Sequence, residues 1–167
     1  MESDMPVRIR KMTEQEFKSF CQWSVEQQAK ELMEERGITW EEAVKETEEE
    51  IAQMLPNGLD TAHNDLMTIA EVSGNESVGA IWTLREETLG RKQSFLCDFV
   101  IWDTNRRKGY ATAALALTEK KAAEAGCQES VLFVADRNAA AHALYEKCGY
   151  RVLRPSGYGK YMIKQLG

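Results

Sequence analysis

The stretch NRRKGYATAALALTEKKA, residues 105–122, decides how the rest of the chain is interpreted. Three cationic residues, Arg106, Arg107 and Lys108, lead to Gly109, and from Ala111 onward small or apolar side chains recur at the spacing of one helical face. The first turn of a helix carries unpaired N–H groups and the positive end of the macrodipole, so a glycine turn that leads into it favours an anion. We therefore expect a phosphate-bearing ligand here; a solvated basic turn before an ordinary helix is the alternative.

Motif spelling, charge and cysteine spacing exclude several ligand classes. The sequence contains neither G-x-x-x-x-G-K-[ST] nor G-x-G-x-x-G, so a nucleoside-triphosphate loop and a dinucleotide fingerprint are not supported. The net charge of −6 argues against a general nucleic-acid binder. Four cysteines without a C-x-x-C pair, together with only two histidines, assemble no zinc spacing. We expect no metal and no nucleic-acid partner.

Length and composition predict one globular domain that spans residues 1–167. A hydrophobic content of 43% and a charged content of 29% are typical of such a domain. The first residues lack an apolar signal core, and no apolar run approaches membrane-spanning length. The cysteines resemble core thiols of a reducing compartment. These observations predict a cytoplasmic protein without a membrane partner.

Capping signals predict two consecutive acidic helices, residues 13–36 and 39–54. The first begins with the capping box Thr13-Glu14-Gln15-Glu16 and stops at Gly37; Thr39 opens the second. Residues 13–54 hold 12 Glu against 4 Lys plus Arg, a charge of −8. This charge either belongs to a solvated helix face or draws a cationic substrate toward a nearby site.

The remaining segments predict an α/β fold. Residues 66–72 and 77–86 indicate a hairpin, and the segment TLGRKQ, residues 88–93, is expected to interrupt the strand pattern. Strand 95–102, helix 109–125 and strand 130–135 form a β-α-β unit whose strands should be parallel. The other expected elements are strands 7–10, 150–154 and 158–164 and helix 138–148.

Two motifs together carry a family resemblance. They are R-x-x-G-x-A at residues 106–111 and N-x-x-A-x-x-L-Y-x-x-x-G-Y at residues 138–150, separated by L-x-V at 132–134. The combination resembles the GNAT superfamily of N-acetyltransferases. The two capped helices, the segment LPNGLDTAHNDL and the tail YMIKQL also resemble a bacterial subgroup of it. The resemblance implies a single GNAT-type α/β domain: a mixed, mostly antiparallel sheet with one splayed parallel pair, flanked by about four helices. The chain departs from the family at Asp136-Arg137, where small or histidine residues are more frequent.

The resemblance also implies acetyl-CoA as the donor, bound by a core at residues 95–154. The diphosphate would lie on the turn and first helical turn, and the pantetheine arm would pair with a strand and with the start of the last helix. The residues implied for the diphosphate are Arg106, Arg107, Lys108, Gly109, Tyr110, Ala111 and Thr112. Those implied for pantetheine are Phe99, Val100, Ile101 and Asn138.

Two residues are the candidates for catalysis. By its place in the second motif, Tyr145 is implied to protonate the departing thiolate; taken alone, a tyrosine on an apolar stripe is more often a core residue. Asp98 interrupts the apolar run FLC-FVIW, where a carboxylate is costly to bury without a partner. Asp98 either orients or deprotonates the amine, or it is a structural aspartate bonded to neighbouring loops.

His63 and Trp82 are weaker candidates for binding the acceptor. His63 either lines the mouth of the acceptor site or caps a turn. Trp82 either forms a wall of that site or packs in the core. The sequence thus predicts an acetyl-CoA-dependent N-acetyltransferase that acts on a primary amine by direct attack in a ternary complex. A non-catalytic acyl-CoA-binding or regulatory domain is the alternative. The expected partner is a small-molecule or peptide amine of cationic character, and a homodimer is compatible with the sequence.

Overall fold

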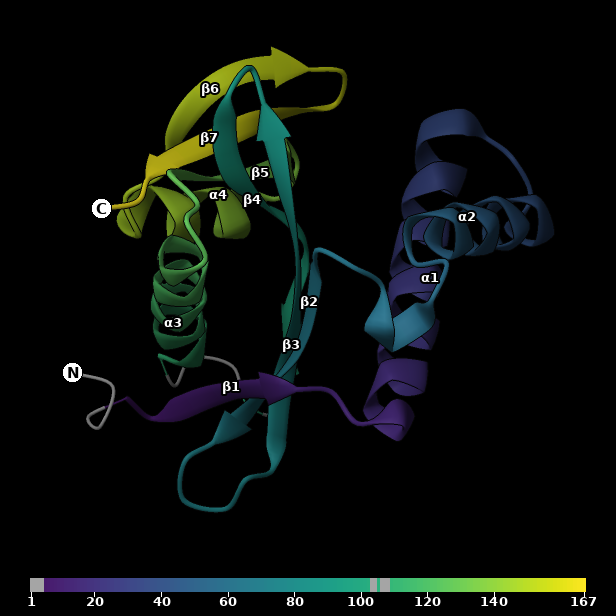
Figure 1. The fold of residues 1–167 in the computed structure, drawn as a ribbon. Helices are drawn as coiled ribbons and strands as arrows, with labels where there is room; N and C mark the ends of the chain where they lie inside the picture. The colour runs from purple at the N-terminus through teal and green to yellow at the C-terminus, as the bar shows by residue number, and fades with distance from the viewer. Residues whose placement is uncertain (1–4, 103–104, 106–108) are drawn as a thin grey trace.

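A computed structural model describes residues 5–102, 105 and 109–167, which form one mixed seven-stranded sheet (Figure 1). The strand order is β1-β2-β3-β4-β5-β7-β6, and every neighbouring pair is antiparallel except β4–β5. The fold predicted from the sequence is confirmed, including the parallel β-α-β unit. The strands are β1 Val7–Lys11, β2 Asn64–Glu71, β3 Ser77–Thr88, β4 Arg91–Ile101, β5 Glu129–Ala135, β6 Arg151–Ser156 and β7 Gly159–Gln165.

Helices cover both faces of this sheet (Figure 1). In the described residues they are α1 Glu14–Arg36, α2 Trp40–Met54, α3 Tyr110–Glu124 and α4 Ala139–Lys147, with a short 3₁₀ helix at Gly58–Asp60. One buried cluster, which includes Leu115 and Tyr145, packs α3 and α4 on the sheet. A second cluster, which includes Phe20 and Trp82, packs α1 on the opposite face. No helix in the described part of the chain is long and apolar enough to cross a membrane.

Hydrogen bonds at the helix ends confirm the capping predictions. The Thr13 hydroxyl accepts from the Glu16 N–H at 3.1 Å, and the Glu16 carboxylate accepts from the Thr13 N–H at 2.9 Å. Helix α1 ends at Gly37, whose φ of +67° suits a residue without a Cβ. Thr39 caps α2 by accepting from the Glu42 N–H at 3.2 Å.

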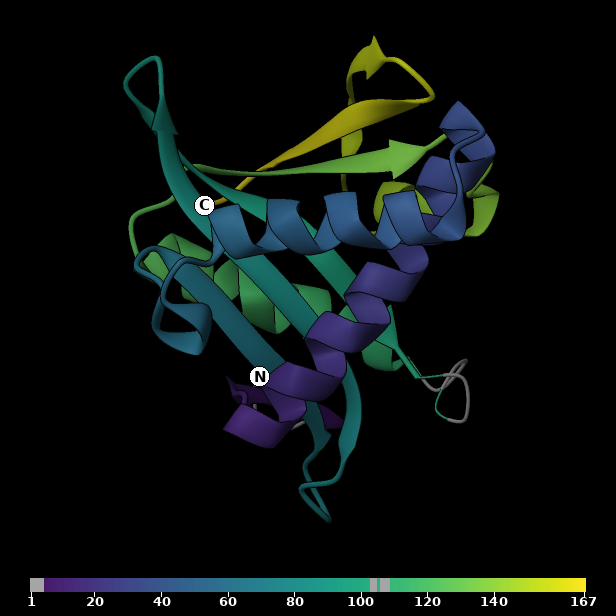
Figure 2. The same cartoon turned by 90° about the vertical axis from the view of Figure 1, so that its right-hand side faces the viewer.

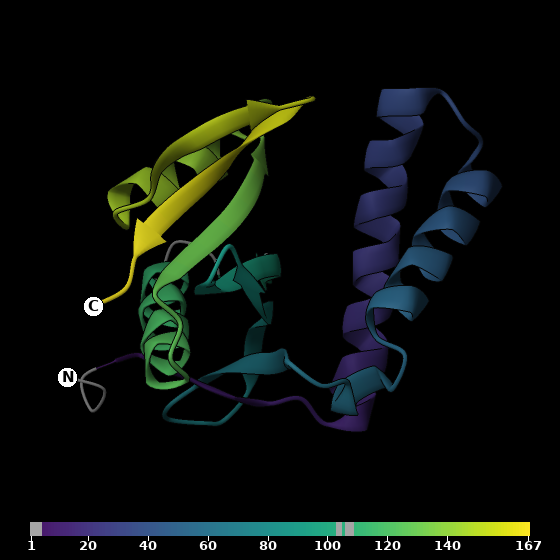
Figure 3. The same ribbon diagram turned by 45° about the horizontal axis from the view of Figure 1, so that its top comes forward.

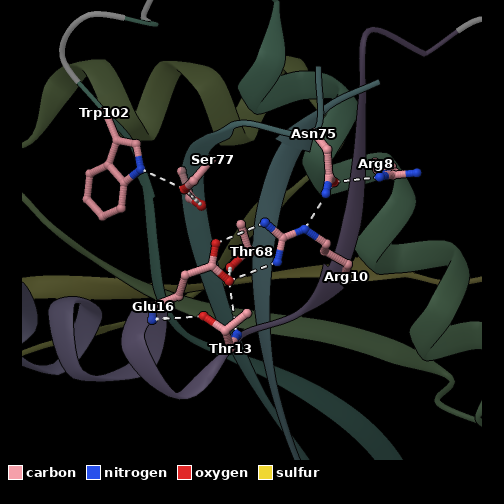
Figure 4. Close-up of polar contacts among 9 residues, drawn as sticks. Arg8, Arg10, Thr13, Glu16, Thr68, Asn75, Ser77 and Trp102 are labelled. Atoms are coloured by element: carbon pink, nitrogen blue, oxygen red, sulfur yellow. Dashed lines mark hydrogen bonds and ion pairs between the residues drawn. The ribbon is translucent and has the colours of Figure 1, made fainter. Parts of the chain in front are cut away.

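Glu16 also fixes the start of α1 to the sheet (Figure 4). Its two carboxylate oxygens accept from the Arg10 guanidinium of β1 at 2.8 and 2.9 Å, and Oε1 accepts from the Thr68 hydroxyl of β2 at 2.9 Å. The hydrogen bond from Arg10 is the largest cause that lowers the pKa of Glu16 to about 2. This partly buried network sets where α1 leaves the sheet.

The interruption expected at residues 88–93 is wrong. Strand β3 continues to Thr88 and β4 already begins at Arg91, which pairs with Thr88. Only Leu89 and Gly90 form the turn, and both have positive φ, +52° and +77°. Two residues with positive φ make a type I′ turn, whose twist matches a hairpin, so the strands continue up to the turn despite their polar sequence.

Strands β4 and β5 are paired over only part of their length. Parallel pairing runs from Gln93–Glu129 to Leu96–Leu132 and then ends, although β4 continues to Ile101. Figure 2 shows the two strands diverging beyond this short ladder. In β4 the divergence begins at Cys97, an extra residue in the pairing with β3 that forms a β-bulge. We call the diverging part of β4 and β5 the open seam.

Candidate active site

Asp98 lies on β4 at the beginning of the open seam, on the face that α1 covers. Its Oδ2 accepts from the Ser24 hydroxyl at 2.6 Å and its Oδ1 from the Phe99 N–H at 3.1 Å. Burial raises the pKa of Asp98 above its ordinary value, while these two hydrogen bonds act in the opposite direction. Across the described residues, no Lys or Arg forms an ion pair with Asp98. A largely buried carboxylate without a counter-ion is suited to receive a cation.

Helix α1 presents a polar stripe to Asp98. Ser24 is fully buried, and its hydroxyl accepts from the Gln28 amide at 2.9 Å, so a chain of donors leads from Gln28 through Ser24 to Asp98. Residues 24, 28, 31 and 35 follow the i, i+4, i+7, i+11 spacing of one helical face. The predictions from sequence missed Ser24 and Gln28. Their signal is this polar stripe in a helix whose neighbouring face is apolar.

Tyr145 lies on α4, on the opposite face of the sheet from α1. The residue is 9% exposed, and its ring packs edge-on against Tyr150 at a centroid distance of 5.8 Å. Burial raises the pKa of Tyr145 to about 12, and the negative charge of Asp98 acts in the same direction. Asp98 and Tyr145 thus lie on opposite faces of the sheet, and the charge of one acts on the pKa of the other.

The position of Tyr145 is fixed at both ends of its helix. Asn138 caps α4 through its side-chain oxygen, which accepts from the Ala141 N–H at 3.1 Å. After the helix, the Tyr150 N–H donates to the Tyr145 carbonyl at 3.0 Å. The Tyr150 hydroxyl lies 2.7 Å from the buried Ser130 hydroxyl of β5. These hydrogen bonds fix both ends of α4, and with them the position of Tyr145.

The predicted diphosphate segment is described only from Gly109 onward, since Arg106, Arg107 and Lys108 lie outside the described residues. Gly109 is the N-cap of α3, has a φ of +77°, and has no side chain with which to cap the first turn. A Cβ added to Gly109 would meet no described atom within 4 Å, so the backbone is open to an approaching ligand. Tyr110, Ala111 and Thr112 form the first turn, where the helix dipole favours an anion.

The predicted pantetheine segment, Phe99, Val100 and Ile101, lies in the open seam on β4. Its partner strand on one side is β3, and the described pairing with β5 has already ended at Leu96. Coenzyme A requires a site for its diphosphate and an extended strand edge for its pantetheine arm. The start of α3 offers the first and the end of β4 the second, and one short connection joins these two elements in the chain. The described residues therefore fit this ligand.

Acidic residues of α1 face the turns that follow β5 and β6. Arg137, in the turn before α4, pairs with Glu34, and its Nη1 lies 3.7 Å from Glu35 Oε1. Burial raises the pKa of Glu31; the charge of Arg137 opposes this rise and that of Asp98 adds to it. Burial, Glu31 and Glu35 likewise raise the pKa of Tyr158 in the β6–β7 turn. Figure 3 shows this turn directed toward the C-terminal half of α1. We call these residues together with Asp98 the acceptor region.

No described contact joins His63 to the acceptor region. His63 is exposed, has a φ of +65°, and lies just before β2, where its carbonyl accepts from the Arg85 N–H at 2.8 Å. Trp82 pairs directly with Asp98 across β3 and β4, but it is 2% exposed and its indole N–H donates to the Asn64 side chain at 2.7 Å. Trp82 thus supports the strand that carries Asp98 from within the core.

His142 on α4 is partly buried. Its side chain is 27% exposed, and its Nε2 lies 3.3 Å from Glu146 Oε1, one turn further along α4.

The chain matches the family model described as the acetyltransferase (GNAT) family over residues 20–150. The chain belongs to this family, and the predicted enzyme class, an N-acetyltransferase, is confirmed. The uncharacterized N-acetyltransferase YdgE of Bacillus subtilis (strain 168) is 32% identical over 146 residues, which cover 87% of this chain and 92% of YdgE. The uncharacterized N-acetyltransferase YycN of the same strain is 29% identical over 149 residues, which cover 88% of this chain and 94% of YycN.

Solved structures share the same architecture. The crystal structure of YycN from Bacillus subtilis gives a TM-score of 0.82 at 26% identity and covers 90% of this chain and 96% of that one. The spermidine N-acetyltransferase from Vibrio cholerae, solved in complex with CoA and spermine, gives a TM-score of 0.67 at 14% identity and covers 96% of each chain. At that identity, the second likeness concerns the fold alone.

Proposed function

We propose that this enzyme transfers the acetyl group of acetyl-CoA to a primary amine by direct attack within a ternary complex. What supports the proposal is the open seam: Asp98, which has no ion pair among the described residues, lies at its beginning, and the charge of Asp98 helps to raise the pKa of the buried Tyr145 phenol. The Asp98 carboxylate would bind a cationic amine, and the Tyr145 phenol would protonate the thiolate that leaves. Such a pair of groups with different protonation states is the usual arrangement for acid–base work.

Residues 95–154 are proposed as the acetyl-CoA-binding core. The backbone of Phe99, Val100 and Ile101 would pair with the pantetheine arm, and Asn138 would contact that arm from the α4 side. The side-chain oxygen of Asn138 already caps α4, which leaves its amide N–H₂ to donate. The residues proposed for the diphosphate are Gly109, Tyr110, Ala111 and Thr112, with Arg106, Arg107 and Lys108 as the neighbouring cations.

Asp98 is proposed to bind the acceptor as an ammonium and to accept its proton, directly or through water. An alkylamine with a pKa of about 10.4 is almost wholly protonated at pH 7, and its deprotonation there costs roughly 4–5 kcal/mol. Burial raises the pKa of Asp98 and so brings the carboxylate closer to the amine in basicity. Ser24 and Phe99 would keep its two oxygens oriented while the proton is transferred.

Tyr145 is proposed to protonate the sulfur that leaves. Acetyl-CoA would supply the thioester: the amine nitrogen, after giving one proton to Asp98, forms the new bond to the acetyl carbon, the carbon–sulfur bond breaks, and the phenol proton goes to the sulfur. The second proton lost by the nitrogen restores the phenol, directly or through water. A phenol with a pKa of about 12 stays protonated at neutral pH. A protonated phenol at this position can donate its proton to the thiolate as it forms.

The acceptor is proposed to be cationic, because the acceptor region contains Asp98 and three further carboxylates of α1 against one described cation, Arg137. The acidic helical pair at residues 13–54 would form the wall of this region. Spermine occupies the complex of the Vibrio cholerae spermidine N-acetyltransferase, so polyamines belong in a first panel of acceptors.

A panel assay tests the proposal. Thiol release from acetyl-CoA is followed with polyamines, lysine-containing peptides, peptide α-amines and aminoglycosides, and acetylated products are identified by the mass of one added acetyl group. We expect turnover with at least one cationic amine and calorimetric binding of both CoA and acetyl-CoA. Binding of acetyl-CoA without turnover on any amine would instead support the non-catalytic acyl-CoA-binding alternative.

A further inference from the structure

Helices α1 and α2 enclose a groove that the acetyl-transfer chemistry does not use. Its volume is about 580 Å³. On α1 it is lined by residues 17, 21, 22, 25 and 26, whereas the stripe that faces Asp98 is 24, 28 and 31. Successive residues of a helix are rotated by about 100°, so most of the groove lies roughly a quarter turn around α1 from the acceptor region. The groove is therefore a separate site.

The floor of the groove is apolar and partly exposed. Trp40 is 41% exposed although it is the first residue of α2 and lies among aliphatic side chains. Exposed apolar surface that is gathered in a concave site usually has an occupant. The apolar residues that define the floor are Phe17, Cys21, Val25, Trp40, Val44 and Ile51.

The rim of the groove is negatively charged. Glu26 of α1 and Glu48 of α2 both line it, and in the described part of the chain neither carboxylate takes part in an ion pair. The helical pair around them, residues 13–54, holds 12 Glu against 4 Lys plus Arg. An occupant that is apolar in its body and positive at one end would complement both the floor and the rim.

The size of the groove favours a small molecule. A helix about 10 Å across with a 5.4 Å pitch fills roughly 400 Å³ per turn, so the groove would hold little more than one turn of a peptide helix. Ligand pockets for small molecules span about 300–1,000 Å³ and combine an apolar lining with a few polar groups. The groove volume of about 580 Å³ falls inside this range.

We propose that the α1–α2 groove binds a lipophilic monocation, that is, an aryl or alkyl body that carries a single ammonium group. The body lies on the apolar floor against Trp40, and the ammonium lies between Glu26 and Glu48. Trp40 adds attraction for the cation through its ring face. This site goes beyond acetyl transfer and does not depend on it.

Calorimetry with 4-phenylbutyl-trimethylammonium tests the proposal, because a quaternary ammonium cannot be acetylated. We expect it to bind at least tenfold more tightly than the neutral 4-phenylbutanol and the anionic 4-phenylbutanoate. Trp40→Ala should weaken binding at least tenfold and Glu48→Gln about threefold or more. The matched controls Met54→Ala and Glu49→Gln, both exposed on α2 and outside the groove, should bind like the wild type.

Three results would overturn the proposal. The first is equal affinity for the cation and the neutral alcohol, or no binding at all. The second is a loss of binding in Asp98→Asn but not in Trp40→Ala, which would place the probe in the acceptor region. The third is a dimer by light scattering that Trp40→Ala converts to a monomer and that the probe dissociates, which would make a second copy of the chain the occupant. Protection of Cys21 from alkylation, read by mass spectrometry against Cys148, would locate the bound probe.

Discussion

Replacement of Asp98 by asparagine separates its chemical role from its structural one. Asparagine has nearly the same shape, but its single carbonyl oxygen can accept from only one of the two donors that Asp98 now satisfies, Ser24 and Phe99. The lost hydrogen bond costs about 1–2 kcal/mol of stability, which the removal of a buried charge partly offsets. The variant is therefore expected to fold.

The catalytic effect should be much larger than the structural one. A positioned base contributes about 10²–10⁴-fold to the rate, or roughly 3–5 kcal/mol, which matches the cost of deprotonating an alkylamine at pH 7. At pH 7 we expect kcat/KM for the best amine to be about 10²–10⁴-fold lower in Asp98→Asn than in the wild type. The affinity for acetyl-CoA should change little. Asp60→Asn, at an exposed carboxylate paired with Lys11, serves as the control and should leave kcat/KM unchanged.

The pH profile distinguishes a base from a merely structural carboxylate. In the wild type, activity should fall as the pH drops through the pKa of Asp98, which burial places above its ordinary value, since only the ionised form accepts a proton. The deficit of Asp98→Asn should shrink as the pH approaches about 10.4, where the amine loses its proton unaided. A deficit of constant size at every pH, or a kcat/KM within threefold of the wild type, would refute the reasoning.

Four further substitutions test other parts of the molecule. Tyr145→Phe should lower kcat about 10²-fold with acetyl-CoA affinity unchanged, because only a proton donor is lost. Gly109→Asp should weaken CoA binding about tenfold or more by calorimetry, because a negative side chain would stand beside the diphosphate. Glu16→Gln should lower the free energy of unfolding by roughly 1–3 kcal/mol at pH 7 in urea titrations. The pKa of Glu16 is lowered from 4.5 to about 2, so this difference should be complete above pH 4.5 and vanish as the pH falls toward 2. Arg137→Ala should lower KM for dicationic amines more than for monocationic ones in steady-state assays, since it frees Glu34 and Glu35.

Each of these has a matched control within the chain. Gly90 has the same φ of +77° and the same open surroundings as Gly109, so Gly90→Asp reproduces the backbone strain without the ligand site. Glu14→Gln removes a charge from the same helical turn as Glu16 but from outside its network. Tyr161→Phe is the control for Tyr145→Phe, and Arg151→Ala is the control for Arg137→Ala. If any control reproduces the effect of its partner substitution, the corresponding interpretation fails.

Local signals made most of the fold predictable. The Thr13 capping box, the glycines that end helices and the continuous apolar strand on β4 are properties of a few neighbouring residues, and the structure bears them out. The strand interruption was predicted wrongly because the polar residues after Gly90 resembled a loop. What decides that segment is the pair of positive φ values at Leu89 and Gly90, which composition does not reveal.

The candidate site was only partly accessible from the sequence, because its contacts join residues far apart in the chain. Ser24 and Asp98 are separated by 74 positions, and Glu34 and Arg137 by 103. A polar stripe on α1 signals that a polar group faces it, but the identity of that group follows only from the sheet register. His63 illustrates the reverse case: its residue type suggested a role at the acceptor, whereas the structure shows an exposed turn residue whose carbonyl accepts from the Arg85 N–H.

The short ladder between β4 and β5 has a mechanical consequence. Backbone pairing between the two halves of the sheet runs only from Gln93–Glu129 to Leu96–Leu132, so in the described part of the chain this ladder is their shared hydrogen-bonded hinge. Twisting motions between the halves will concentrate there, and among the β4 amides that face β5, those beyond Leu96 will exchange with deuterium sooner than those of the paired stretch. A molecule that bonds to both halves at once opposes that torsion, and it stabilises the folded chain by RT ln(1 + [L]/Kd), so the melting temperature rises with its concentration.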